Sequence, residues 1–516
     1  MGSPPAPLRT VAPRVPSPAE IVARDRSGRQ LFLHAAVFDP LAARPDYVSV
    51  GFPAAASPYA LVQFHPGRLA GKESLEAHGV RFVGYVPDNA FLVRRSPSVE
   101  TLLAQSPDVR WVGAWEPGFK VESRLWPGSG DPGTRVTVVF FPGAVAGREA
   151  DALVAQVPEA LRTAVLDDDV SPRARFAMPR SSRDAFVRAA SLAGEVVWIE
   201  PYDPPLLLSN DSLGPIQSNA PTVLSAGACT SCTIFLHGIT GTGQIVALSD
   251  TGNDSDMCFF RKSGAPGDVT DADLTTPPSI GNLDPAKKVI GYWVQPGASA
   301  YDDNTACGGI PNGFHGTQTS GVAVGDDYAT PSTASFPGVD VGDGMAPNAQ
   351  LLFQDVGDTV TGCLNGISDL RKLFQQARDG GARVHSNSWG SVTAGAYTSD
   401  DQSADRFLFD HEEMAIVFAV GNSGSGSGST LSPANAKDVI AVGALQHGAS
   451  TTIAGFSSRG PTADGRIKPD LVAPGVSINS AAGDASHTDA NCSTKTMTGT
   501  SFATESTLRP RASPVK

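Results

Sequence analysis

The stretch Gln244-Ile-Val-Ala-Leu-Ser-Asp-Thr-Gly252 decides the fold, because a continuous apolar run ends there in an aspartate and a glycine turn. An apolar run without alternation predicts a strand that is buried on both faces, as in a parallel sheet covered by helices. Three later runs have the same character: Ala349–Gln354, Met414–Val420 and Val439–Gly443. The second part of the chain is therefore predicted to be α/β, with functional side chains at the carboxyl ends of its strands.

Four polar residues stand where core packing would not require them. Asp250 ends the first of these strands, and Asn422 follows a later one. His315 lies in an exposed glycine turn before a predicted helix of small residues, and Ser501 begins a helix-like segment near the end of the sequence. Each residue alone would be an ordinary cap, turn residue or hydrogen-bonded histidine. Their combination is what indicates a functional site.

The four side chains match the needs of acyl transfer. A serine hydroxyl is a weak nucleophile until a histidine takes its proton, and a carboxylate holds that histidine in the required tautomer. A side-chain amide can then donate a hydrogen bond to the oxyanion that develops in the transition state. The order Asp, His, Ser along this chain is that of subtilisin among the three unrelated orders of the triad.

Longer motifs carry a family resemblance over about residues 240–504. Successive stretches resemble the signatures of subtilisin-like serine proteases, and the runs HSNSWG and FSSRGPTADGRIKPD are similar to the alkaline-protease branch of that family. The matching stretches, in order, are Asp250-Thr-Gly252, His315-Gly-Thr317, Asn387-Ser-Trp-Gly390, Gly421-Asn422, Phe456–Asp470 and Gly499-Thr-Ser501. The implied fold is a parallel sheet flanked by helices.

The resemblance implies a role for each matching residue. Asp250 orients His315, His315 acts as the base, and Ser501 attacks the substrate. Asn422 completes the oxyanion hole, and Ser388-Trp389-Gly390 fall where the family pairs the substrate backbone as an added strand. Peptide or protein substrates follow, with no metal or cofactor for catalysis. A related family of serine-carboxyl peptidases has glutamate in place of the histidine, so His315 excludes it.

Two stretches in the first part of the chain match each other. Val109–Pro117 and Val196–Pro204 share aromatic, acidic and proline positions, and their tryptophans, like their prolines, are 87 positions apart. Before each stretch lie, in the same order, an apolar strand, a helix-like segment, a second strand and a second helix. This is the ferredoxin-like pattern. We therefore predict two small α+β domains before the α/β domain.

Glycine- and proline-rich segments set the predicted domain boundaries. We expect an N-terminal extension at 1–50, ferredoxin-like repeats at 51–125 and 126–207, an incomplete catalytic domain at 208–504 and a non-family tail at 505–516. Subtilisin-like proteases commonly carry a ferredoxin-like prodomain that assists folding and blocks the cleft. The repeats resemble such a module, doubled. A permanent accessory domain is the alternative.

Charge, hydropathy and cysteines limit the partners and the compartment. The net charge of −13, with no basic run, argues against nucleic acid, and no stretch is apolar over the roughly 20 residues of a membrane span. We expect a monomer outside the cell or in its envelope, although the N-terminus has Pro and Ser where a signal peptide would be apolar. The six cysteines allow disulfides or buried free thiols. Cys229-Thr-Ser-Cys232 lacks the second pair of a zinc site.

The sequence departs from the family pattern in two places. Gln318 and Thr319 replace the usual histidine and valine, so the predicted helix loses apolar contacts with the sheet. After Thr504 the chain has Glu505 and then two prolines, where the family continues its serine helix with small apolar residues. On this basis no helical continuation is expected beyond Thr504.

The leading hypothesis is a serine endopeptidase made as a zymogen. One alternative is a catalytically impaired, truncated remnant whose N-terminal repeats act as an inhibitor-like or binding module, and another is an ester hydrolase. Structural calcium is frequent in the family. Asp302-Asp303 and Asp326-Asp327 are the candidate ligands.

Overall fold

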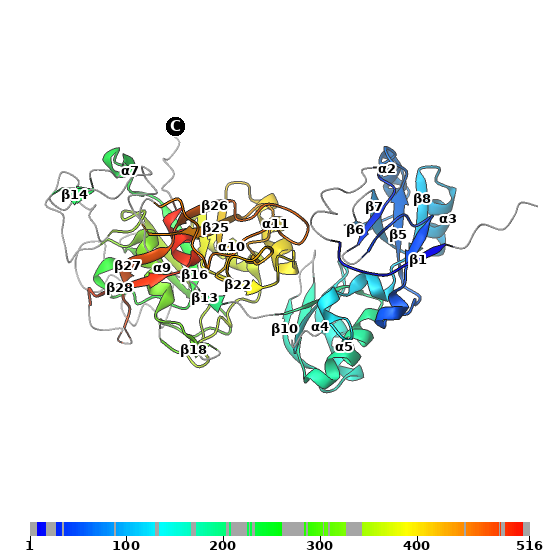
Figure 1. Ribbon diagram of the computed structural model, residues 1–516, viewed down its shortest axis with the longest axis horizontal. Helices are drawn as coiled ribbons and strands as arrows, with labels where there is room; N and C mark the ends of the chain where they lie inside the picture. Colours follow the sequence, from blue (N-terminus) through cyan, green and yellow to red (C-terminus); the bar gives the residue numbers. More distant parts are fainter. Residues whose placement is uncertain are drawn as a thin grey trace, which may run out of the picture. The chain divides into compact units, whose positions relative to one another are not determined.

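The computed structural model describes most of the chain as two compact units, Met1–Asp203 and Pro204–Lys516 (Figure 1). The described residues are 8–16, 27–33, 36–86, 89–129, 134–166, 172–202, 206–207, 224–225, 228–229, 233–260, 283–284, 287–302, 304–307, 310–326, 343–447, 450–484, 486 and 491–508.

The first unit contains two copies of one βαββαβ arrangement. The first copy consists of β5 (Tyr59–Phe64), α2 (Ala70–Ala77), β6 (Phe82–Val86), β7 (Ala90–Arg94), α3 (Pro97–Gln105) and β8 (Val109–Ala114). The second consists of β9 (Arg135–Phe140), α4 (Ala146–Gln156), β10 (Leu161–Leu166), β11 (Arg173–Ala177), α5 (Arg180–Leu192) and β12 (Val196–Pro201). The antiparallel sheets have the equivalent orders β6-β7-β5-β8 and β10-β11-β9-β12. The predicted pair of small α+β domains is confirmed.

The two copies also share a strand register. Trp111 in β8 lies opposite Gln63 in β5, and Trp198 in β12 lies opposite Val139 in β9. In both copies the next residue of the last strand pairs with the preceding residue of the first strand. The offset of 87 positions in the sequence therefore relates structurally equivalent residues.

A single apolar core joins the two copies. Tyr59 and Leu61 of β5 pack in the same cluster as Val138 of β9 and Phe186 of α5. Outside the copies, the unit contains β1 (Arg9–Val11), β2 (Leu31–Leu33), β3 (Ala36–Phe38), β4 (Ala43–Pro45) and the 3-10 turns η1 (Tyr47–Val50), η2 (Pro117–Lys120) and η3 (Ser123–Leu125). Side chains of β2, β3, η1 and both later turns enter this core. The Tyr59 hydroxyl adds a polar tie, since it donates to Glu195 Oε2 at 2.7 Å.

The second unit is built on a seven-stranded parallel sheet. Its order is β17-β20-β16-β21-β23-β25-β26. The strands are β16 (Ile245–Asp250), β17 (Val289–Val294), β20 (Gln350–Asp355), β21 (Val384–Asn387), β23 (Ala415–Ala419), β25 (Ile440–Leu445) and β26 (Leu471–Pro474). β17 and β20 lie on one side of β16 in the sheet, and the strands that come later in the sequence lie on the other side. The carboxyl end of β16 is therefore a topological switch point, where α/β sheets place their sites.

Helices cover both faces of this sheet, as the sequence predicts (Figure 1). Val417 of β23 points into a core with Ala323 of α9 (His315–Val324) and Ala503 of α12 (Thr500–Ser506). Its neighbours Ile416 and Phe418 point to the opposite core, which contains side chains of α10 (Leu370–Asp379) and α11 (Ser399–Asp410). Burial on both faces explains why the strands are continuously apolar.

Smaller elements surround the sheet. A three-stranded sheet has the order β13-β22-β24, formed by β13 (Leu206–Leu207), β22 (Trp389–Val392) and β24 (Leu431–Ser432). A hairpin of β27 (Val476–Ala481) and β28 (Thr494–Thr498) precedes α12. The remaining elements are β14 (Leu224–Ser225), β15 (Ala228–Cys229), β18 (Ala306–Cys307), β19 (Ile310–Pro311), α7 (Thr233–Leu236) and the 3-10 turn η4 (Cys258–Phe260).

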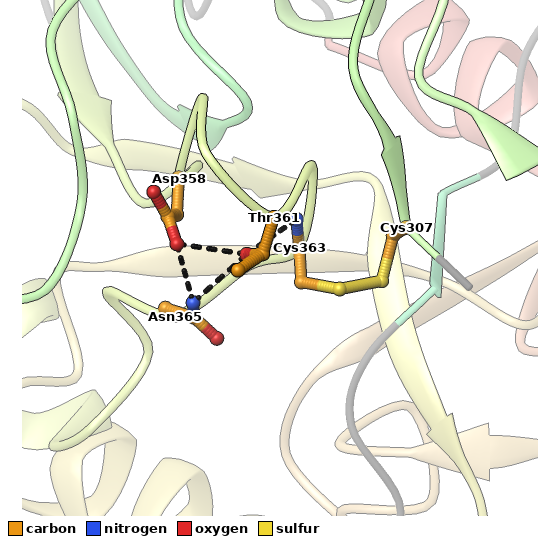
Figure 2. The surroundings of a disulfide bond; sticks show 5 residues. All are labelled: Cys307, Asp358, Thr361, Cys363 and Asn365. Atoms are coloured by element: carbon orange, nitrogen blue, oxygen red, sulfur yellow. Dashed lines mark hydrogen bonds between the residues drawn. A yellow bond between two sulfur atoms is a disulfide. The ribbon is translucent and has the colours of Figure 1, made fainter. Parts of the chain in front are cut away.

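A disulfide between Cys307 and Cys363 joins β18 to the loop after β20 (Figure 2). Within that loop, Asp358 Oδ2 accepts hydrogen bonds from Thr361 Oγ1 and Asn365 Nδ2, both at 2.8 Å. For these two cysteines the structure decides between the alternatives of a disulfide and a free thiol.

The end of α12 differs from expectation. The helix continues past Thr504 to Ser506, and all seven of its residues are buried. Leu508 then packs in the core beside Ala503. A polar residue can continue this helix because the hydroxyl of Ser386 in β21 and that of Ser388, just after this strand, donate to the Glu505 carboxyl group. Across the described part of the chain, no helix is long and apolar enough to span a membrane.

Candidate active site

Asp250 is the last residue of β16 and is fully buried. The Thr251 N–H donates to its Oδ1 at 2.8 Å, and the Thr319 hydroxyl lies 3.3 Å from its Oδ2. Thr319 is one of the two departures from the family pattern. The Thr319 hydroxyl thus makes a hydrogen bond to the Asp250 carboxylate, where the valine usual in the family would make an apolar contact.

His315 is the first residue of α9 and is only 2% exposed, so the expectation of an exposed turn is wrong. Phe314 precedes it in the left-handed conformation, with φ of 60°. A Cβ at Gly316 would lie 2.0 Å from the Gly252 carbonyl oxygen. The glycine after the histidine thus permits close backbone contact with the loop after β16, and this contact buries the turn.

The structure brings Asp250, His315 and Ser501 into one chain of contacts. Nδ1 of His315 lies 2.7 Å from Asp250 Oδ1, and its Nε2 lies 3.2 Å from Ser501 Oγ. Ser501 is the second residue of α12 and is fully buried. Its hydroxyl can also donate to the Ser388 carbonyl oxygen, at 3.1 Å. The hydroxyl proton therefore has two acceptors within reach.

Asn422 lies on the loop after β23 and is half-buried. Its Oδ1 accepts hydrogen bonds from Thr500 N and Thr500 Oγ1, both at 3.0 Å. These bonds orient the side-chain amide of Asn422 beside the residue that precedes Ser501. Because Thr500 occupies Oδ1, the Nδ2 group of Asn422 is the part of the amide that can donate a hydrogen bond to an oxyanion.

Ser388 lies between β21 and β22, and Trp389 and Gly390 are the first two residues of β22. The Trp389 ring is buried, and its Nε1 donates to the Ser249 carbonyl oxygen at 3.0 Å. The backbone of Trp389 and Gly390 pairs antiparallel with Leu207 and Leu206 of β13. The edge of β22 at these residues therefore accepts an added strand.

Glu505 contacts the side chain of Ser388. This residue is the first of the segment that was predicted to be a non-family tail. Its Oε1 accepts hydrogen bonds from the hydroxyls of Ser386 and Ser388, both at 2.8 Å. Burial raises the pKa of Glu505 to about 8, and the two serine hydroxyls oppose this shift. The side chain therefore carries its proton at neutral pH.

Three buried polar residues without a predicted catalytic role lie around the Asp250–His315 pair. Two of them, Thr251 and Thr317, belong to the matching motifs, and the third is Asp302. From the sequence, Asp302 is predicted only as a calcium candidate. Its oxygens accept hydrogen bonds from Thr251 Oγ1, Thr317 N and Thr317 Oγ1. Because donors occupy the positions of a cation, Asp302 does not fit a calcium ligand.

The other parts of the calcium prediction remain open. Asp303 and Asp327 lie outside the described residues, and Asp326 is buried at the end of the segment that follows α9. Among the described residues, no group of three or more His, Cys, Asp or Glu side chains could hold a metal ion.

Two family models match the chain. The model of the subtilase family matches residues 241–505, and a domain of unknown function matches residues 32–116. The first match extends over all the residues of the candidate site, including Glu505. The second covers the whole of the first ferredoxin-like copy, together with β3, β4 and most of β2.

Curated relatives include two serine proteases and a further peptidase. The serine protease/ABC transporter B family protein tagD of Dictyostelium discoideum is 29% identical over 49% of this chain and 17% of its own length. Serine protease AprX of Bacillus subtilis is 41% identical over 18% of this chain and 23% of its own length. The C5a peptidase of Streptococcus pyogenes is 30% identical over 42% of this chain and 18% of its own length. The chain thus spans less than a quarter of each of these relatives.

Solved structures with similarity include fervidolysin of Fervidobacterium pennivorans, a keratinolytic enzyme related to subtilisin. It is 20% identical, with a TM-score of 0.44, over 73% of this chain and 53% of that one. Sphericase is 23% identical, with a TM-score of 0.35, over 57% of this chain and 80% of that one. Since the subtilase model alone covers more than half of the sequence, the chain belongs to the subtilase family of serine peptidases.

Proposed function

We propose that the chain is a serine endopeptidase that hydrolyses peptide bonds through Asp250, His315 and Ser501. The observation that carries this proposal is the position of the His315 ring between the other two side chains, at 2.7 and 3.2 Å. An ordinary structural histidine needs no serine at its second nitrogen. The contact therefore does not favour the alternative of an inactive remnant in which only the N-terminal repeats bind a partner.

The reaction follows from these contacts. Ser501 Oγ attacks the carbonyl carbon of the substrate while its proton moves to His315 Nε2, and Asp250 stabilises the resulting imidazolium. Asn422 Nδ2 donates to the oxyanion as the carbonyl bond opens. His315 then returns the proton to the leaving amine, which produces an acyl ester on Ser501. Water then attacks this ester while His315 takes its proton, and the carboxylic acid is released as Ser501 Oγ regains a proton from His315.

Peptides are the proposed substrates because of the edge of β22. An extended peptide can add to this edge through backbone hydrogen bonds at Trp389 and Gly390, as β13 does within the chain. Ser388 lies at the end of the same edge, and its carbonyl oxygen contacts the Ser501 hydroxyl. A strand added here would run directly toward the nucleophile.

The same pairing supports the proposal that the chain is made as a zymogen. β13 begins three residues after the end of the first unit and takes the edge that a substrate would need. The first unit, with its two ferredoxin-like copies, would then be a pro-region.

An extracytoplasmic location is also proposed, because a disulfide such as Cys307–Cys363 persists in oxidising compartments. Structural calcium and a monomeric state remain predictions.

A fluorophosphonate reagent, which phosphonylates activated serines, tests the proposed chemistry. The full chain should be labelled at Ser501, and Ser501→Ala should remove the label. Ser403→Ala is the matched control, because Ser403 is also buried but bonds the Ser399 carbonyl oxygen within α11. Labelling that survives in Ser501→Ala would contradict the assignment.

A further inference from the structure

Asp302 is a fully buried carboxylate close to the proposed triad that the reaction does not use. Its Oδ1 accepts a hydrogen bond from Thr251 Oγ1 at 2.9 Å. Its Oδ2 accepts two more from Thr317, one from the backbone N–H at 2.8 Å and one from the hydroxyl at 2.7 Å. Asp302 thus bonds one residue from the Asp-Thr-Gly motif and one from the His-Gly-Thr motif.

Both of these partners lie next to the proposed catalytic groups. Thr251 follows Asp250 directly and donates its N–H to the Asp250 carboxylate. Its hydroxyl oxygen also accepts a hydrogen bond from Gly316 N, at 2.9 Å, beside His315. Thr317 lies in the first turn of α9, two residues after His315. Asp302 therefore bridges the two segments that carry the base and its orienting carboxylate.

The backbone segments around this bridge are in close contact at two glycines. A Cβ at Gly252 would lie 2.5 Å from the backbone of Tyr301 and Asp302. A Cβ at Gly316 would lie 2.0 Å from the Gly252 carbonyl oxygen. The three segments are therefore in van der Waals contact, and the hydrogen bonds of Asp302 link them.

We propose that Asp302 is a positioning residue, which holds the Asp250 carboxylate and the His315 ring in the geometry needed for proton transfer. This inference rests on the proposed function, because it assigns a role in the same reaction. A misplacement of about 1 Å in such a site can reduce the rate about 100-fold. Loss of the carboxylate should therefore reduce reactivity rather than the binding of a substrate.

A purely structural role is the competing explanation, and Asp401 provides the matched control. It is also a fully buried carboxylate, and it accepts hydrogen bonds from Thr398 N and Thr398 Oγ1 at the start of α11. Burial raises the pKa of both Asp302 and Asp401 to about 7. Asp302→Asn and Asp401→Asn thus make the same chemical change in two similar environments, only one of which adjoins the triad.

The experiment compares the rate of fluorophosphonate labelling with thermal unfolding in the full chain. We expect both asparagine variants to lower the melting temperature, while only Asp302→Asn slows labelling, by about 10- to 100-fold. Thr251→Val should slow labelling in the same way, and Thr251→Ser, which retains the hydroxyl, should restore most of the rate. Equal labelling rates in Asp302→Asn and the parent chain would overturn the proposal, as would equal slowing in Asp401→Asn.

A second readout separates this proposal from the proposed function. The His315 Nδ1 proton, hydrogen-bonded to Asp250, should give a far-downfield proton NMR resonance in the parent chain and in Ser501→Ala. Asp302→Asn should shift or remove it. If the parent chain is not labelled at all, the proposed function fails, and this resonance alone decides the role of Asp302. An unchanged resonance in Asp302→Asn, or none in the parent chain, would overturn the inference.

Discussion

Replacement of Glu505 by glutamine should make the stability of the protein less dependent on pH. The Glu505 carboxyl group is fully buried, and its Oε1 is held by the hydroxyls of Ser386 and Ser388. Burial raises the pKa of Glu505 from 4.5 to about 8. Glutamine has nearly the same shape and keeps an oxygen for the two serines, but it carries no titratable proton.

The size of the effect follows from the pKa difference. The folded protein holds the Glu505 proton more tightly than the unfolded chain does. The resulting stability is complete below about pH 4.5 and is lost as the pH rises to about 8. Each pKa unit corresponds to about 1.4 kcal/mol, so the parent chain loses about 3 kcal/mol relative to Glu505→Gln by pH 7 and about 5 kcal/mol by pH 9. The other buried carboxyl groups titrate in both proteins and cancel in the difference.

Urea unfolding of both proteins at pH 5, 7 and 9 measures this difference. The stability gained by the Glu505→Gln variant should increase steadily with pH. Glu413→Gln is the control, since Glu413 is exposed and its hydrogen bond with Arg378 lowers its pKa. Any change in that variant should therefore have the opposite direction. A difference between Glu505→Gln and the parent chain that stays constant from pH 5 to 9 would refute the reasoning.

Three further predictions follow from the site and its surroundings. Asn422→Ala should reduce turnover about 100- to 1000-fold with little change in KM, because the amide acts on the oxyanion; a change confined to KM in steady-state kinetics would contradict this. Removal of the Cys307–Cys363 disulfide by a double alanine substitution should lower the free energy of unfolding by up to about 4 kcal/mol, because the bond closes a long loop of 56 positions. Equal denaturant midpoints for the two proteins would exclude that contribution. A fragment of residues 1–207 should inhibit an intact relative of the catalytic unit. Substitution of proline at Leu206 and Leu207, which removes backbone donors from β13, should weaken inhibition, and undiminished inhibition would argue against the pairing with β22.

The strands and the ferredoxin-like copies could be predicted because their signals are local. Continuous apolar runs mark β16, β20, β23 and β25, and a constant offset reveals the duplication. Asp250, His315, Asn422 and Ser501 could be proposed from their places after strands and in motifs.

The polar network around the triad could not be predicted, because tertiary contact creates it. Asp302 and Thr251 are 51 positions apart, and nothing near Asp302 in sequence distinguishes it from an exposed loop aspartate. The burial of His315 depends on the approach of Gly316 to Gly252, which no local pattern reveals. The disulfide partner of Cys307 could not be predicted for a similar reason, since six cysteines allow many pairings.

The single core that joins the two N-terminal copies has a consequence during synthesis. The first copy is complete at Ala114, but the strand that completes the second ends at Pro201. At about 5 to 20 residues per second, a ribosome needs roughly 4 to 17 s to add the intervening residues. During that time Tyr59 and Leu61 lack the side chains of β9 and α5 that bury them in the finished unit. The nascent first copy thus exposes an apolar sheet face for seconds, and during this time that face is open to association with other chains.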